Sequence, residues 1–376
     1  MAEDIDFGSL VVPGTFIRVR AEGLISAGGI STGNIGIVGT AAKGYGTTEI
    51  LTDFRSAVNA FGPYDSFETK KHNLVRALEL LFANGARTIY ARALAPTDAE
   101  GVEETETFTA QNINAQFAEL VKDDVNILVL PESGAADAST ILRALVENNE
   151  THGKDMMAIV GTDQSTVANI TGQVTVNDRL VFCAPGLIVK EPRTNQAGKV
   201  DMVEVSLPGT YTAAAVAGLL SSLSVATSPT NKGLPGVTKL GQTFNYGELT
   251  ALINGGVLVL ENRGGVRIVR GVTTEQKDGL PFRQISTRRI VDFAKAGVRK
   301  VGNTFLGRLN NVRVRKALQG AIQGFLDTMV QGEALTGYDL EVTATRADEI
   351  ANRAIVNLRL RPTFSIDFST KVEASI

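Results

Sequence analysis

The sequence predicts an α/β fold that continues into an α+β section, with extended β-strand arms at both termini. The first observation is a series of short apolar segments that alternate with helical patterns, as in a parallel sheet covered on both faces. The second is a long amphipathic helix predicted over residues 311–330, after two short strands. The third is a strict alternation of apolar and polar residues close to both ends of the chain. A length of 376 residues allows two or three such units.

Residues 1–25 are predicted to be an extended N-terminal arm. Pro13 and Gly14 precede a short alternation that places Ile17 and Val19 on one face of a strand. No neighbouring segment is an obvious partner, so we expect the arm to pair with the sheet of another copy of the chain. The alternative is that it folds back on its own sheet. The residues expected to make the contact between copies are Thr15, Phe16, Ile17, Arg18 and Val19.

Residues 26–95 are predicted to form an N-terminal α/β segment. A strand at 35–40 is followed by a short helix that begins after Asp53, a favourable N-cap residue. A second helix has the apolar stripe Leu74, Leu78, Leu81 and Phe82, and the pair Asn84 and Gly85 ends it before a strand at 88–94. The polar and acidic residues 96–120 show no clear period and are predicted to be a short linker or insertion.

Residues 121–240 are predicted to be a second α/β domain, because strands and helices alternate again. The expected elements are strands at 126–130, 157–160 and 180–183 and helices at 138–147 and 213–220. The loop 225–237, which contains Pro229, Gly233, Pro235 and Gly236, marks a boundary.

Residues 241–350 are predicted to be an α+β domain, and residues 351–376 a C-terminal strand arm. The expected elements of the domain are strands at 257–260 and 266–269 and helices at 287–300 and 311–330. The arm should contain two half-buried strands, with Pro362 between them at an edge or a bend. Its apolar residues, expected to pair with a neighbouring copy, are Val356, Leu358, Leu360, Phe364, Ile366 and Phe368.

The net charge of −3 conceals a gradient along the chain. Residues 1–150 hold 11 basic and 21 acidic residues, whereas residues 263–376 hold 19 basic and 11 acidic ones. The basic excess is densest in 263–316, where 14 Lys and Arg stand against three acidic residues. Such polarity predicts either a nucleic-acid site at the basic end or head-to-tail binding between copies.

The residue types argue against several kinds of chemistry. One cysteine and two histidines leave no ligand set for a zinc or iron–sulfur site, and Cys183 follows an apolar run typical of a core. The segments 39–44 and 44–49 lack the residue order of a P-loop and the third glycine of a dinucleotide site. We therefore expect no cofactor and no metal. The acidic first residues and the lack of a long apolar run predict synthesis in the cytoplasm without membrane insertion.

The central α/β domain resembles the subtilisin fold without its catalytic triad. The segment 209–218, Gly-Thr-Tyr-Thr-Ala-Ala-Ala-Val-Ala-Gly, is similar to the helix that carries the nucleophilic serine of subtilisin-type proteases. Tyr211 occupies the position of that serine, and Pro131 or Glu132 stands where the family has its aspartate. The protein is therefore not expected to be an enzyme.

Four segments of the chain have the residue pattern of one known family. In the N-terminal part they are 35–44, Ile-Gly-Ile-Val-Gly-Thr-Ala-Ala-Lys-Gly, and the helix end and strand within 80–92. In the C-terminal part they are 284–293, Gln-Ile-Ser-Thr-Arg-Arg-Ile-Val-Asp-Phe, and 358–364, Leu-Arg-Leu-Arg-Pro-Thr-Phe. Through these segments the chain as a whole resembles the contractile tail sheath proteins of bacteriophages and of related injection particles. A subtilisin-like central domain without a triad, followed by an α+β C-terminal sheath domain, is also a feature of that family.

The resemblance implies a structural subunit. Many copies would form a helical sheath of stacked rings around an inner tail tube and contract to drive the tube through a bacterial envelope, ejecting genome or payload. The implied partners are further copies, the tube protein, and baseplate and tail terminator proteins, with no direct nucleic acid. The implied location is the virion tail or a released contractile particle, after assembly in the bacterial host cytoplasm. In the family the inner domain faces the tube, so the basic residues expected to touch an acidic tube are Arg308, Arg313, Arg315 and Lys316, with a plain solvated face as the alternative.

The rival function is nucleic-acid binding by the basic stretch 263–316, which would demand phosphate contacts and a steep salt dependence. That stretch has few aromatic residues and no RNA-binding signature or zinc finger. The sheath subunit is therefore the preferred prediction.

Overall fold

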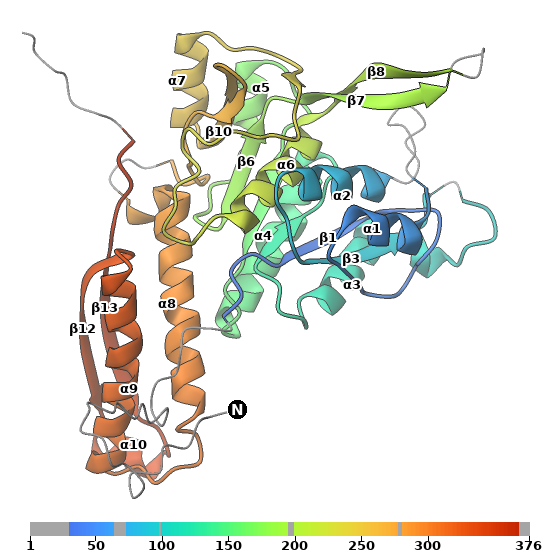
Figure 1. Cartoon of the computed structure of the whole chain (residues 1–376). Coiled ribbons are helices and arrows are strands. Elements are labelled where there is room, and N and C mark those ends of the chain that lie inside the picture. The colour runs from blue at the N-terminus through green and yellow to red at the C-terminus, as the bar shows by residue number, and fades with distance from the viewer. Residues whose placement is uncertain (1–29, 64–72, 98, 195–198, 277–279, 368–376) are drawn as a thin grey trace, which may run out of the picture.

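The computed structural model of the chain describes residues 30–63, 73–97, 99–194, 199–276 and 280–367. Figure 1 shows a broad α/β body, from which a narrower C-terminal unit extends. The mixed α/β architecture expected from the sequence is confirmed.

The α/β body is built on an eight-stranded sheet with the order β11-β10-β6-β5-β4-β1-β3-β2. Its strands are β1 (Ile35–Thr40), β2 (Glu49–Leu51), β3 (Ile89–Leu94), β4 (Ile127–Val129), β5 (Met157–Gly161), β6 (Leu180–Ala184), β10 (Val257–Asn262) and β11 (Val266–Ile268). The six central strands run parallel, and the edge strands β2 and β11 pair antiparallel. Every residue of β1, β4, β5 and β6 is buried, which explains why these strands read as continuous apolar runs.

Helices cover both faces of this sheet. One face carries α1 (Phe54–Phe61), α2 (Asn73–Ala83) and α6 (Gly209–Ser222). The other face carries α3 (Ala110–Leu120), α4 (Ala135–Thr151), α5 (Val167–Gly172) and α7 (Tyr246–Asn254). Asp53 caps α1 by accepting a hydrogen bond from the Ser56 amide, and Gly85 follows α2 with a φ of 103°, so both predicted helix limits are confirmed.

Helix α3 corrects the prediction that residues 96–120 lack a periodic element. The acidic Glu104–Glu106 form only a 3-10 turn, but the following residues make a helix that buries Ile113, Phe117 and Leu120 against the sheet. These three residues are spaced by four and three, as one face of a helix requires. Strongly polar residues flank these three apolar residues, so the helical pattern is weak in the sequence.

The α/β body extends beyond residue 240, where the sequence placed a boundary. Strand β10 pairs with β6 and carries β11, so both strands belong to the large sheet and not to the C-terminal unit. A second, three-stranded sheet was not foreseen; it consists of β7 (Leu187–Thr194), β8 (Val200–Leu207) and β9 (Lys239–Leu240) in the order β8-β7-β9. The β7–β8 hairpin projects from the body in Figure 1.

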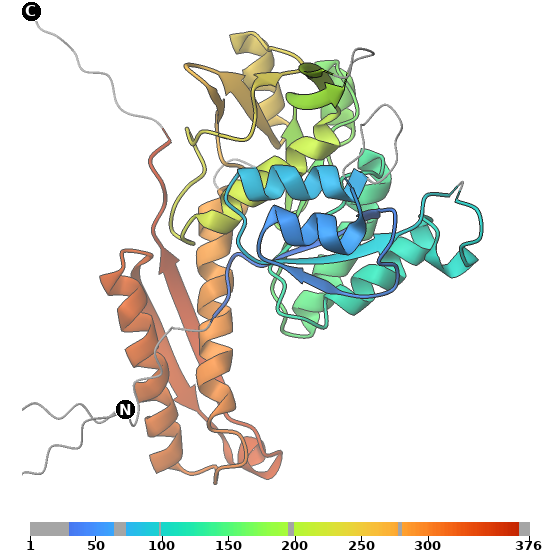
Figure 2. The ribbon, with the colours of Figure 1, turned by 45° about the vertical axis from the view of Figure 1, so that its right-hand side comes forward.

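The C-terminal unit begins after a short 3-10 turn, Pro281–Arg283. Its elements are α8 (Ile285–Asn303), α9 (Val312–Gln331), β12 (Leu335–Thr343), α10 (Arg346–Ile350) and β13 (Ile355–Pro362). Figure 2 shows α8 and α9 side by side, with the antiparallel strands β12 and β13 beside them. The apolar residues of α9 that are buried are Leu318, Ile322, Phe325, Leu326 and Met329. Gly297 of α8 allows the two helices to approach closely, since a Cβ at this position would lie 2.0 Å from the ring of Phe325.

Two negative findings concern the part of the chain that the structure describes. No helix there is long and apolar enough to cross a bilayer. No three His, Cys, Asp or Glu side chains there gather in a way that would hold a metal ion.

Candidate functional site

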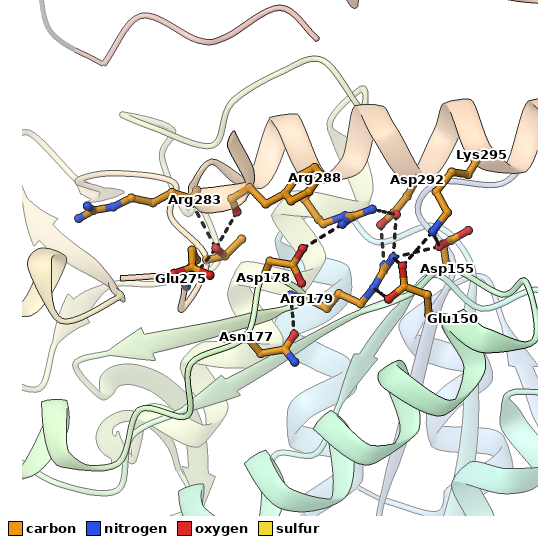
Figure 3. A network of polar contacts seen from close by, with 12 residues as sticks. Glu150, Asp155, Asn177, Asp178, Arg179, Glu275, Arg283, Arg288, Asp292 and Lys295 are labelled. Atoms are coloured by element: carbon orange, nitrogen blue, oxygen red, sulfur yellow. Dashed lines mark hydrogen bonds and ion pairs between the residues drawn. The ribbon is translucent and has the colours of Figure 1, made fainter. Parts of the chain in front are cut away.

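A network of ion pairs joins α8 to the α/β body, and Figure 3 shows it from close by. We call it the charged junction; it consists of Arg179, Arg288, Lys295 and Arg299 with Glu150, Asp155, Asp178 and Asp292. Arg179, directly before β6, lies at its centre with 1% of its side chain exposed. Its guanidinium contacts carboxylates from both sides: Glu150 at 2.6 Å, Asp155 at 2.9 Å and Asp292 of α8 at 2.9 Å.

Helix α8 supplies one face of the charged junction. Its charged residues at 288, 292, 295 and 299 are spaced by four, three and four, so they lie on one side of the helix. The further pairs are Arg288 with Asp178 (2.9 Å) and Asp292 (2.6 Å), Lys295 with Glu150 (2.9 Å) and Asp155, and Arg299 with Asp155 (2.7 Å). The side that meets the body is therefore ionic as well as apolar.

The protonation of the charged junction follows from these contacts. Burial alone would lower the pKa of Arg179, but the hydrogen bonds and charges of Glu150 and Asp292 outweigh it and raise the pKa above its usual value. The hydrogen bond from Arg179 is the largest influence on Glu150, whose pKa falls to about 2. Both groups are therefore charged at neutral pH. Because removal of one partner would leave a buried charge uncompensated, the charged junction fixes α8 to the body.

The charged junction uses three of the 14 basic residues in 263–316, namely Arg288, Lys295 and Arg299. Within this stretch the cations paired with carboxylates are Arg263, Arg270, Arg288, Lys295, Arg299 and Arg315. Arg289 is also buried, and it donates to the backbone carbonyls of Leu223 at 3.0 Å and Thr32 at 3.3 Å. Burial lowers its pKa to about 10. Cations held in this way do not form the exposed row that binding to phosphates requires.

The residues at the catalytic positions of the subtilisin comparison lie in the interior. Tyr211 is 1% exposed, and burial, together with the charge of Glu132, raises the pKa of its phenol well above the usual value. Glu132 accepts hydrogen bonds from the Thr40 amide at 2.7 Å and the Thr40 hydroxyl at 2.5 Å, and burial raises its pKa to about 7. Tyr211 therefore packs in the core, and Glu132 holds Thr40 by two hydrogen bonds.

Strands β12 and β13 form a sheet of only two strands within the described residues, so each strand has an outer edge without a strand partner there. The arm residues Val356, Leu358 and Leu360 pair with the chain's own β12 and pack, half-buried, against the core of the C-terminal unit. Charged and polar residues alternate with them and are exposed. Part of the predicted C-terminal arm is thus a structural strand of this subunit.

Residues 363–367, which follow β13, still alternate between apolar and polar side chains. Asp367 forms an ion pair with Arg270 of the body at 2.8 Å. Phe364 and Ile366 are 56% and 87% exposed. The described residues 363–367 form no strand, which corrects the prediction of a second strand there. The remaining arm residues, which lie outside the described part of the chain, are Thr15, Phe16, Ile17, Arg18, Val19 and Phe368.

The four basic residues predicted to face a tube lie near the free end of the C-terminal unit, but in different environments. Arg315 is 11% exposed and pairs with Glu349 at 3.1 Å. Arg308 is exposed and stacks on the ring of Phe305 at 4.7 Å. Arg313 and Lys316 are exposed on α9. The structure therefore brings three of the four to the surface, and Arg315 holds α10 in place.

The fold is an α/β body joined by buried ion pairs to a C-terminal unit, whose two-stranded sheet has outer edges without a strand partner among the described residues. Such edges are typical of structural subunits that assemble by strand pairing. The model of the phage tail sheath protein central domain matches residues 106–274, and that of the phage tail sheath C-terminal domain matches residues 277–370. The chain belongs to the phage tail sheath protein family. Its predicted role as a contractile tail sheath subunit is thereby confirmed, and no comparison supports nucleic-acid binding.

Solved structures show the same fold over nearly the whole chain. The anti-feeding prophage helical sheath in its contracted state has a TM-score of 0.71 at 18% identity, covering 97% of this chain and 100% of that chain. The contracted PVC sheath complex of an extracellular contractile injection system has a TM-score of 0.73 at 17% identity, covering 98% of each chain. The sheath tail protein of Desulfitobacterium hafniense has a TM-score of 0.66 at 14% identity, covering 93% and 100%. No curated protein sequence matches the chain.

Sequence reasoning missed the charged junction. Arg179 and Asp292 are 113 positions apart, and nothing in the local sequence connects them. The one signal that could have indicated it is the row of charges at 288, 292, 295 and 299 on the face of α8 that a core-facing helix would keep apolar.

Proposed function

We propose that this protein is the repeating subunit of a sheath that polymerises helically around an inner tube and contracts to drive that tube through a bacterial envelope. Family membership over the central and C-terminal domains supports this role. The observation that carries the assembly mechanism is the two-stranded sheet of β12 and β13, whose outer edges have no strand partner in the part of the chain that the structure describes.

Strands of neighbouring copies would complete this sheet. A two-stranded sheet is marginal by itself, and a free edge presents unpaired N–H and C=O groups to any strand that can reach it. The exposed Phe364 and Ile366 lie directly after β13 and would enter a neighbour's sheet with Phe368. The N-terminal arm residues 15–19 would pair in the same way. Each copy would then stay joined to its neighbours through these paired strands while the contacts between bodies change.

The body would form the outer part of the sheath as a subtilisin-like domain without a catalytic triad. The proposed divisions are an N-terminal arm 1–25, an α/β body that continues through β11, a C-terminal sheath domain that begins after the body and ends with β13, and a C-terminal arm 363–376. We infer that contraction draws on subunit rearrangement alone, because the sequence has no nucleotide-binding motif. No enzymatic step is part of the proposal.

The partners proposed are an inner tube protein, a baseplate and a tail terminator. A solved relative is described as part of the anti-feeding prophage baseplate, which supports the second of these. The exposed Arg308, Arg313 and Lys316 would face an acidic tube surface, with Arg315 behind them. Assembly would take place in the bacterial host cytoplasm, and the product would be a virion tail or a released particle.

Negative-stain microscopy of the protein with and without its tube protein tests the proposal. The full chain should form hollow helical tubes or stacked rings. Deletion of residues 1–20 or of residues 363–376 should leave monomers; the second deletion spares β13, which the chain needs for its own fold.

A matched control separates strand exchange from a general loss of exposed apolar surface. Phe364→Ser with Ile366→Ser should prevent polymers, whereas Tyr246→Ser, at a residue 86% exposed on α7, should not. A full-length chain that stays monomeric beside its tube protein, with deletions that change nothing, would refute the sheath assignment.

A further inference from the structure

The first residues of the C-terminal arm, 363–367, are held on the chain's own body. We call this contact the arm clamp; it consists of Ser365 and Asp367 of the arm with Thr230 and Arg270 of the body and Gln284, the residue directly before α8. Figure 2 shows the chain continuing from β13 toward the body. Asp367, with 6% of its side chain exposed, accepts hydrogen bonds from Arg270 Nε at 2.8 Å, the Thr230 hydroxyl at 3.2 Å and the Gln284 amide at 3.3 Å.

The side-chain amide of Gln284 occupies the backbone of Ser365. Its Oε1 accepts a hydrogen bond from the Ser365 N–H at 3.1 Å, and its Nε2 donates to the Ser365 carbonyl at 3.3 Å. A residue of an adjacent antiparallel strand would bond to Ser365 in the same way, through one N–H and one C=O. Gln284 is the N-cap residue of α8 but makes no side-chain capping bond there, so its amide serves the arm and not the helix.

One group of the arm clamp lacks a hydrogen bond. The hydroxyl of Ser365 is buried and has no hydrogen-bond partner among the described residues. An unpaired buried hydroxyl disfavours the state that contains it by about fivefold or more. Phe364 and Ile366, on either side of Ser365, are exposed. The closed arm clamp is therefore held by several hydrogen bonds and opposed by one unsatisfied group, as in an element with two accessible states.

Strand exchange requires the residues that the arm clamp holds. The edge of the arm that carries the N–H and C=O of Ser365 is closed to a neighbouring strand while Gln284 occupies it, and Asp367 keeps the segment on the body. Resting on the proposed function, we propose that the arm clamp is an autoinhibitory contact. It keeps the C-terminal arm of a free subunit on its own body, and its opening makes the arm available to the sheet of a second copy.

The size of the effect follows from the fraction of molecules in which the arm clamp is open. When only a fraction of a protein is competent to bind, its apparent affinity is reduced by that fraction. One hydrogen bond of usual strength shifts such an equilibrium by about fivefold, so loss of the Gln284 bonds should raise the open fraction by about tenfold or more. The concentration needed for polymerisation should fall by the same factor.

The test measures the lowest concentration at which the purified full chain polymerises, by light scattering and negative-stain microscopy. Gln284→Met keeps the length of the side chain and removes its amide, so it should lower this concentration by about tenfold or more. Ser365→Ala removes the unsatisfied hydroxyl, so it should stabilise the closed arm clamp and raise the concentration by about fivefold. The matched control is Gln111→Met, at an exposed residue of α3, which should leave it unchanged.

Hydrogen exchange of residues 363–367, measured below the polymerising concentration, reports on the arm clamp without assembly. Exchange should be faster than in the wild type for Gln284→Met and slower for Ser365→Ala. Because the two variants should act in opposite directions, a general loss of folding does not imitate the result. Polymerisation of Gln284→Met at the same concentration as the wild type, or only at a higher one, would overturn the inference. If the wild type and all variants stayed monomeric beside the tube protein, the proposed function itself would be overturned.

Discussion

Replacing Arg179 by Met should loosen the attachment of α8 to the body. The change keeps the aliphatic stem and removes a guanidinium that is 1% exposed and contacts Glu150, Asp155 and Asp292 at 2.6 to 2.9 Å. Removal of one partner from a buried ion pair typically costs about 3–5 kcal/mol. Each of the three carboxylates keeps another cation of the charged junction, so we expect the lower end of that range, about 3 kcal/mol.

Thermal unfolding of the purified subunit measures this loss. With an unfolding entropy of about 2.1 cal/mol/K per residue, a chain of 376 residues shifts by about 1.3 °C per kcal/mol, so the variant should unfold roughly 4 °C below the wild type. The control is Arg263→Met, which breaks the exposed pair with Glu261 and should cost less than about 1 kcal/mol. If the two variants unfolded at the same temperature, the charged junction would not fix α8, and the reasoning would be refuted.

Three further predictions concern packing, pH and reactivity. Gly297→Ala should destabilise the fold by about 1–3 kcal/mol in urea unfolding, because its Cβ would meet the Phe325 ring at 2.0 Å. Gly302→Ala, on the same helix with nothing within 4 Å, should be neutral or stabilising; equal losses for both would contradict this. Burial raises the pKa of Glu132 from 4.5 to about 7, so its folded form binds the extra proton, and stability present below pH 4.5 is lost as pH rises through 7. Relative to Glu132→Gln, the wild type should therefore lose about 3 kcal/mol between pH 5 and 8, and a constant difference would exclude this. Burial raises the pKa of the Cys183 thiol above its usual range, so iodoacetamide should label it only in denatured protein, and labelling of the native chain would contradict its burial.

The elements that the sequence predicted are those with a local signal. The strands of the large sheet other than β2 are short, mainly apolar segments. The apolar face of α9 repeats with the period of a helix, so both kinds of pattern can be found from neighbouring residues alone. Strand β12 alternates between apolar and charged or polar residues only from Tyr338 onward, because the register shifts between Leu335 and Gly337. This interruption weakens its strand pattern in the sequence. The charged junction has only a partial local signal, the charges along one side of α8, because Arg179 pairs with Asp292 only after the body and α8 have folded together.

The candidate site was only partly predictable for the same reason. The alternation of Val356, Leu358 and Leu360 indicated a strand, but period alone does not choose between a partner in the same chain and one in a neighbour. Likewise the four predicted basic residues shared one sequence property, their charge. Arg315 differs from the exposed Arg313 and Lys316 because it forms an ion pair with Glu349 of the same chain, and only the folded structure places Glu349 beside it.

Helix α8 can transmit a rotation of the body to the far end of the C-terminal unit, because it is attached to the body by the charged junction. It has 19 residues, so it is about 28 Å long, and no kink-forming proline interrupts it. A rotation of about 10° at the body end of such a rod displaces its other end by about 5 Å, close to the spacing of neighbouring β strands. In the sheath proposed above, a small turn of the body would therefore move the far end of α8 far enough to break one set of contacts and form the next.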